Sequence, residues 1–206
     1  MAKKNYFKNL AGIFGAYKTK VDEAKKIYDA TTKEIRSRYR PGSERFKEET
    51  DKIQRAYDGA MQIAYGEYTK DVKAAIDLAR FQIGESVAAQ ITDADKAIFE
   101  RLADRNTAPA ERAILAARVS PAYAAQKRLH EITGGEFGNY RYVGILMDEL
   151  SRAEDTFNRA AFSYRAEGDA YLSMVIAKGE YTAELDEKVS AFLTTYPAES
   201  TGAANA

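Results

Sequence analysis

The placement of proline is the feature that most constrains the fold of this chain. Only four prolines occur in 206 residues, and the stretches 42–108 and 122–196 contain none. A proline inside a helix removes a backbone hydrogen bond and clashes with the preceding turn, so helices tend to end close to one. Both stretches are rich in Ala, Glu, Lys and Arg, which favour the helix. The sequence therefore predicts long helices.

The apolar residues of these stretches recur in steps of three and four, which indicates helices with one buried stripe each. We predict an all-α fold of long antiparallel helices, in a hairpin or bundle with coiled-coil-like seams, together with a cluster of short helices and a disordered C-terminal tail. The three predicted seams are Tyr17, Val21, Ala24, Tyr28, Thr31 and Ile35; Tyr57, Met61, Tyr65, Tyr68, Val72, Ile76, Ala79, Ile83 and Val87; and Val143, Met147, Leu150, Glu154, Phe157, Ala161, Tyr164, Gly168, Tyr171 and Val175.

Changes in composition and in turn residues divide the chain into five predicted segments. The last ten residues contain one charged residue and no large apolar side chain, which is typical of a disordered tail. The segments are a basic amphipathic N-terminal segment over 1–20, a long helical hairpin over 21–90, a short-helix cluster over 91–135, a long helix plus a terminal helix over 139–195, and the tail over 196–206.

The predicted short-helix cluster carries three separate sets of helix-start signals. Thr92 and Asp95 have the spacing of a capping box, in which each side chain accepts a hydrogen bond from the other residue's backbone N–H. The pair Gly134-Gly135 is expected to end the last helix of the cluster. The other two starts are expected at Thr107 with Pro109 and at Ser120 with Pro121.

The stretch RSRYRPGSERF, residues 36–46, has two readings. A corner between two helices explains every residue, because basic side chains favour a helix C-terminus, Pro-Gly permits a turn and Ser43 can cap the next helix. A phosphate-binding cluster with a stacking ring is the other reading. Acidic residues follow at once and the formal net charge is zero, so the corner is favoured and nucleic acid is not the expected partner. The basic set is Arg36, Arg38, Tyr39, Arg40 and Arg45.

The first 21 residues contain five lysines and no acidic residue, and their apolar members are spaced as on one helix face. Three alternatives stay open: this face packs on the chain's own bundle, docks on a partner protein, or lies on an anionic membrane surface. The apolar run is too short and interrupted for a secretory signal or a transmembrane segment. The candidate docking residues are Lys3, Lys4, Phe7, Lys8, Leu10, Ile13, Phe14, Lys18 and Lys20.

No residue set in the sequence carries a catalytic pattern. The absence of cysteine excludes disulfides, thiolate metal sites and thiol catalysis. The single histidine, His130, precedes the expected helix end and is best read as a capping or surface residue. No glycine-rich phosphate loop occurs. We therefore predict no catalytic, cofactor-binding or metal-binding residues and no enzymatic activity.

Taken over the whole chain, the basic start, the long Ala-, Tyr-, Lys- and Glu-rich helices, the single corner and the small-residue tail resemble bacteriophage virion or scaffold-type helical structural proteins. This resemblance implies a non-enzymatic assembly protein that acts through helix–helix interactions. Its partners would be copies of itself in a homo-oligomer and other protein subunits, and its location would be the cytoplasm or the virion. The alternative is a helical protein held at a membrane surface by its basic N-terminal segment.

Overall fold

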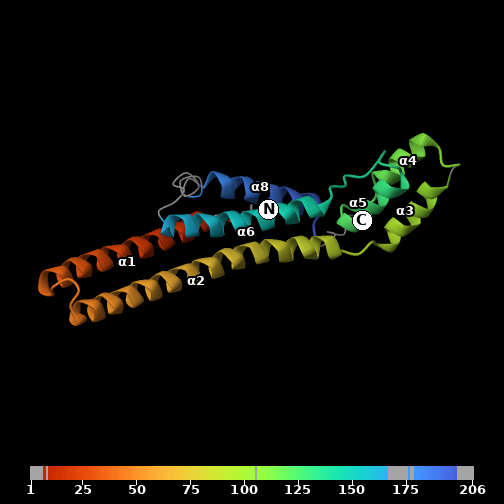
Figure 1. The fold of residues 1–206 in the computed structure, drawn as a ribbon. Coiled ribbons are helices and arrows are strands. Elements are labelled where there is room, and N and C mark those ends of the chain that lie inside the picture. Colours follow the sequence, from red (N-terminus) through yellow and green to blue (C-terminus); the bar gives the residue numbers. More distant parts are fainter. Residues whose placement is uncertain (1–6, 8, 105, 167–175, 177–178, 199–206) are drawn as a thin grey trace, which may run out of the picture. The chain divides into compact units, whose positions relative to one another are not determined.

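The computed structural model describes residues 7, 9–104, 106–166, 176 and 179–198. Within them it contains seven helices and no strand, so the predicted all-α class is confirmed. Figure 1 shows these helices along the chain. Their bounds are α1 Leu10–Arg38, α2 Glu44–Ala88, α3 Asp93–Ala103, α4 Pro109–Ala116, α5 Tyr123–Ile132, α6 Val143–Arg165 and α8 Glu180–Thr195.

The chain divides into two compact units, and each is described by itself. The hairpin unit comprises the described residues within 6–76 and 151–185, and the short-helix unit comprises those within 77–150 and 186–206. The division falls inside α2, α6 and α8, so each of these helices contributes residues to both hydrophobic cores.

In the hairpin unit, α1 packs against the first part of α2. The rings of Tyr17 and Tyr68 are 5.0 Å apart, and those of Tyr28 and Tyr57 are 4.9 Å apart. The later residue on α1, Tyr28, contacts the earlier residue on α2, Tyr57. The two helices are therefore antiparallel, as predicted (Figure 1). The helix α1 also crosses the predicted boundary between residues 20 and 21 without a break.

The corner between these two helices follows the turn chemistry of its residues. Gly42 adopts a φ of 87°, which costs a residue with a Cβ considerably more than it costs glycine. The Ser43 Oγ then accepts a hydrogen bond from the Phe46 N–H at 3.3 Å and caps α2. The helix α1 ends at Arg38, because the chain is already extended at Tyr39. Arg40, the residue before the proline, also disfavours the helix.

The helix α6 covers the inner part of the hairpin, where the buried core is dense. The Tyr17 hydroxyl donates a hydrogen bond to the Ala161 carbonyl oxygen at 3.0 Å. The Tyr68 hydroxyl donates to the Phe157 carbonyl oxygen at 2.9 Å. Further buried residues of the hairpin unit are Phe7, Leu10, Phe14, Val21, Met61, Ala64, Val72 and Ile76.

The buried stripe of α6 departs in part from the predicted seam. Leu150, Phe157 and Ala161 are buried as predicted, but Met147 and Glu154 are only half-buried. A straight helix has 3.6 residues per turn, so its stripe drifts away from a strict heptad. Leu146, Ala153 and Ala160 are buried in their place, whereas Gly168, Tyr171 and Val175 lie outside the described residues.

In the short-helix unit, α3 packs on α4 and α5 around a compact apolar core. The predicted capping box of Thr92 and Asp95 is present at the start of α3. Gly134 and Gly135 follow the end of α5 with positive φ angles of 62° and 88°, as expected for a helix stop. The core residues are Phe99, Leu102, Leu115, Ala116, Val119, Ala122, Ala125 and Leu129.

Two of the predicted helix starts in this unit are displaced. Thr107 does not cap α4, because its hydroxyl donates to the Arg101 carbonyl oxygen at 2.7 Å and Ala108 occupies the cap position. The helix α5 begins at Tyr123 and not at Pro121. The Ser120 N–H instead donates a hydrogen bond to the Asp95 Oδ1 at 2.8 Å, and Ser120 therefore belongs to the connection before α5.

The C-terminal tail was predicted to begin at residue 196, and this boundary is wrong. Tyr196 has no exposed surface. Its hydroxyl donates to the Asn139 carbonyl oxygen and accepts from the Arg141 N–H at 2.8 Å, and its own carbonyl oxygen accepts from the Ser86 hydroxyl. A tyrosine whose ring is buried and whose hydroxyl is hydrogen-bonded is part of the core. Residues 199–206 lie outside the described residues.

Candidate helix-docking surface

The outer part of the hairpin, residues 22–60, is built differently from the inner part. We call this region the outer hairpin. The inner hairpin is the remainder of α1 and α2 in the same unit, residues 10–21 and 61–76. Among its residues only Ile35 belongs to the buried core, with 7% of its surface exposed. The other members of the seam are half-buried: Ala24, Tyr28 and Thr31 on α1, and Phe46, Thr50, Ile53 and Tyr57 on α2.

The difference between inner and outer hairpin arises where α6 ends. The hydroxyl of Tyr164, the second-to-last residue of α6, donates to the carboxylate of Asp22 at 2.7 Å. Tyr17, Val21, Ala24 and Tyr28 form one continuous stripe on α1 by their spacing of four, three and four. The part of the stripe before Asp22 contacts α6. The part after Asp22 has no third helix over it among the described residues.

The outer stripe has aromatic and aliphatic groups in a fixed arrangement. The Tyr28 hydroxyl donates to the Gln54 Oε1 at 2.9 Å, and this contact holds its ring beside that of Tyr57. Ile27, the neighbour of Tyr28, is 67% exposed. Apart from Ile35, the side chains of this seam are not enclosed by α1 and α2. The outer hairpin is therefore the surface best suited to receive further helices.

The N-terminal residues predicted to dock on a partner are mostly engaged inside this chain. Phe7, Leu10 and Phe14 have no exposed surface, and Ile13 is half-buried. Their apolar face packs within the hairpin unit, which corresponds to the first of the three alternatives.

The basic members of the same set are partly engaged as well. The Lys18 ammonium lies 4.9 Å from the ring centre of Tyr164, a cation–π contact. Lys20 forms an ion pair with Glu67 across the hairpin. Lys3, Lys4 and Lys8 lie outside the described residues.

The basic set at the corner is spread over three local structures. Arg36 and Arg38 occupy the last turn of α1, where Arg38 pairs with Glu34. Arg40 lies in the connecting turn and Arg45 in the first turn of α2, and all four arginines are exposed. Tyr39 is half-buried at the end of α1. These positions correspond to the corner reading of the arginine-rich stretch.

His130 lies in the last turn of α5, as predicted, within an aromatic cluster. Its ring centre is 5.5 Å from that of Tyr140, which in turn lies 5.6 Å from the ring of Tyr123. Tyr123 also contacts Phe192 and Tyr196 of the C-terminal part of the chain. The cluster thus connects α5 to the last turn of α8 and to Tyr196 after it, and this long-range role could not be read from local spacing.

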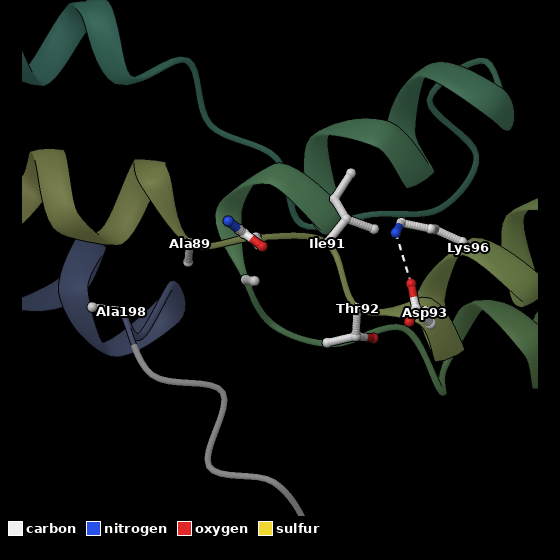
Figure 2. Close-up of a pocket in the computed structure, with 8 residues that line it drawn as sticks. Ala89, Ile91, Thr92, Asp93, Lys96 and Ala198 are labelled. Carbon is white, nitrogen blue, oxygen red and sulfur yellow. Dashed lines mark hydrogen bonds and ion pairs between the residues drawn. The ribbon is translucent and has the colours of Figure 1, made fainter.

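A hollow of about 380 Å³ opens beside the start of α3 in the short-helix unit. Figure 2 shows Ala89 and Ala198 on one side of it and Lys96 and Asp93 on the other. The Lys96 Nζ donates to the Asp93 Oδ1 at 2.7 Å, so these two charges are paired with each other. The lining residues include no histidine, serine or tyrosine, and the hydroxyl of Thr92 among them is hydrogen-bonded to Asp95 at 2.8 Å as part of the cap of α3.

Among the residues that the structure describes, no group of three or more His, Cys, Asp or Glu residues could hold a metal ion. None of the helices described is both long and apolar enough to cross a membrane.

The buried tyrosines give the fold a pH dependence on the alkaline side. Burial raises the pKa of Tyr17 to about 12 and also raises that of Tyr68. Burial and the hydrogen bond to the Asp22 carboxylate raise the pKa of Tyr164 to about 12. In the unfolded chain these phenols ionise near their ordinary pKa of 10.0, so the folded state holds more protons above that pH.

We therefore expect the stability of the hairpin unit to be intact below pH 10 and to be lost between pH 10 and pH 12. A pH titration that records tyrosinate absorbance and far-ultraviolet circular dichroism together checks this. A fraction of the phenols should ionise only as helicity disappears. Ionisation of every tyrosine near its ordinary pKa with the helices retained would contradict it.

No protein-family model, curated protein or solved structure matches this chain. The case for a function therefore rests on the geometry of the two units and above all on the outer hairpin.

Proposed function

We propose that this protein is a non-enzymatic structural protein that assembles with copies of itself through helix–helix contacts, as a virion or scaffold component of the bacteriophage type does. The observation that supports the proposal is the seam of the outer hairpin. Its residues continue the spacing of the inner hairpin, yet all of them except Ile35 are half-buried, whereas the inner residues Phe14, Tyr17 and Tyr68 are buried.

The physical reason is the small amount of apolar surface that two helices bury. Isolated helices are marginal in water, and most helical stability in proteins comes from packing an apolar face against other elements. In the inner hairpin α6 supplies that packing, through the contacts of Tyr17 and Tyr68 with its backbone. In the outer hairpin, Tyr28 and Tyr57 are only half-buried. Helices from another subunit would complete the same three- or four-helix arrangement there.

The proposal is tested by light scattering coupled to size-exclusion chromatography on the full chain, over a range of protein concentrations. We expect one oligomer of defined mass. The variant Ile53→Glu places a charge in the half-buried seam and should shift the mass toward the monomer while far-ultraviolet circular dichroism stays unchanged. The matched control is Ile63→Glu, because Ile63 is 65% exposed on α2 outside the outer hairpin.

Two results would count against an assembly function. One is a monomer at every concentration. The other is an oligomer that dissociates equally with Ile53→Glu and with Ile63→Glu, since the seam would then have no specific part in association.

A further inference from the structure

We infer that the occupant of the outer hairpin is the outer hairpin of a second copy of this chain, docked antiparallel so that the two corners point in opposite directions. This inference rests on the proposed function and adds to it the surface, the partner and the geometry. The product is a four-helix bundle in which α1 packs on α1 of the second copy and α2 packs on α2 of the second copy.

The first argument is the symmetry of the seam. On α1 the seam residues follow one another in steps of four, three and four, so the pattern is symmetric about a point between Asp29 and Ala30. Antiparallel pairing then places Tyr28 opposite Thr31 of the second copy, and Ala24 opposite Ile35. In both pairs a large side chain faces a smaller one, which is how opposing seams interdigitate.

The helix α2 has the same symmetry. Its seam residues are also spaced by four, three and four, and they are symmetric about a point between Asp51 and Lys52. Antiparallel pairing places Phe46 opposite Tyr57 of the second copy, an aromatic pair, and Thr50 opposite Ile53.

The two symmetry points lie at nearly the same height on the hairpin. One lies between eight and nine residues before the end of α1 at Arg38, and the other lies between seven and eight residues after the start of α2 at Glu44. The hydrogen bond from Tyr28 to Gln54 joins two residues that each lie ten residues from the corner end of their helix, slightly farther from the corner than the two symmetry points. A single two-fold axis can therefore relate both helix pairs at once, which an isologous dimer requires.

The charges follow the same symmetry. Residues 22–29 of α1 carry three acidic and two basic side chains, whereas residues 30–38 carry three basic and one acidic. On α2 the order is the same: residues 44–51 carry four acidic and two basic side chains, and residues 52–60 carry two basic and one acidic. Antiparallel docking brings the basic half of each helix onto the acidic half of its counterpart, and this complementarity specifies orientation.

The position of α6 favours the antiparallel arrangement over one in which the corners lie together. The seam continues the stripe that α6 covers in the inner hairpin. With the corners together, the α6 helices of both copies would meet at the same height between the hairpins. With the corners opposed, each outer hairpin continues the path of the other copy's α6 and the two inner bundles lie at opposite ends.

The chain contains no cysteine, so single cysteines report the geometry without background. In the antiparallel dimer, Thr31 lies about 4.5 Å along the axis from Thr31 of the second copy, whereas the two Ser37 residues are about 22 Å apart along it. The experiment treats full-length Thr31→Cys and Ser37→Cys with a bis-maleimide that spans roughly 10 Å, a reach between these two separations, and measures the yield of covalent dimer.

We expect Thr31→Cys to give covalent dimer with at least a tenfold higher yield than Ser37→Cys. Efficient cross-linking of Ser37→Cys would show that the corners lie together and would overturn the inference. Cross-linking of neither variant, in a chain that light scattering shows to be oligomeric, would overturn this geometry and leave the assembly function standing. A chain that is monomeric by light scattering would overturn both.

Discussion

Replacing Phe14 by alanine should lower the free energy of unfolding of the hairpin unit by about 3–5 kcal/mol, the range observed when a large buried aromatic side chain is deleted. Phe14 has no exposed surface, and its ring lies 6.0 Å from that of Tyr68 and 6.3 Å from those of Tyr17 and Tyr164. The substitution would leave a cavity at the place where three helices meet, and these rings could collapse into it only in part.

Urea unfolding followed by far-ultraviolet circular dichroism measures this effect. The control is Ile63→Ala, which removes an exposed aliphatic side chain from the same unit and should shift the midpoint only slightly. The comparison also decides what the apolar face of the N-terminal segment is for. If Phe14→Ala leaves the midpoint where it is and only weakens binding to another protein, this face serves a partner and the packing described above is not its main role.

Replacing Asp95 by alanine should cost the short-helix unit about 2–4 kcal/mol, since the change removes both a helix cap and a charged hydrogen-bond acceptor. Asp95 is 2% exposed. Its Oδ1 accepts from the Ser120 N–H at 2.8 Å, and its Oδ2 accepts from the Thr92 hydroxyl at 2.8 Å and from the Thr92 N–H at 3.2 Å. One carboxylate thereby joins the start of α3 to the connection before α5.

The Asp95 carboxylate should also make the stability of the short-helix unit depend on pH in the acid range. Burial alone would raise the pKa of Asp95, but the hydrogen bonds from Ser120 and Thr92 outweigh it and hold the pKa below the ordinary 3.8. The stabilising effect of Asp95 is therefore complete above that pH and is lost as the pH falls through the lower pKa of the folded state. In Asp95→Asn this part of the acid dependence should disappear from denaturation curves recorded at a series of pH values.

Asp93 provides the matched control for both experiments. It lies two residues earlier in the same helical turn, but it is exposed and its partner is the exposed Lys96. Surface pairs of this kind contribute little, so Asp93→Ala should change the midpoint far less than Asp95→Ala. Equal effects of the two substitutions would show that helix-terminal charge matters here and that the buried hydrogen bonds of Asp95 do not.

Local signals in the sequence were enough to predict much of this fold. The corner between α1 and α2 follows from Pro41, Gly42 and Ser43, and the start of α3 follows from Thr92 and Asp95, because turns and caps are made by residues close together in the chain. The seam of α2 was predictable for the same reason, since its periodicity is contained within one helix.

The features that depend on distant contacts were not predictable in the same way. Nothing near Tyr196 indicates that Asn139, Arg141 and Ser86 bind it, so the tail boundary was set too early. The end of the α6 contact at Asp22 is equally a tertiary property. The seam has the same spacing before and after that residue, and only the structure shows which half a third helix covers. That difference is the basis of the candidate docking surface.

The pairing of α1 with α6 also has a consequence for how the chain acquires its structure during synthesis. Tyr17 and Ala161, which hydrogen bond to each other, are separated by 144 residues in sequence. The corner is local, so α1 and the first part of α2 can form as soon as they leave the ribosome, whereas the helix that closes the inner core is made much later. Until then the stripe of Phe14, Tyr17 and Tyr68 is uncovered along its whole length and is open to any apolar surface nearby. Another nascent copy on the same message presents the same stripe, so inner and outer hairpin compete for identical partners until α6 arrives.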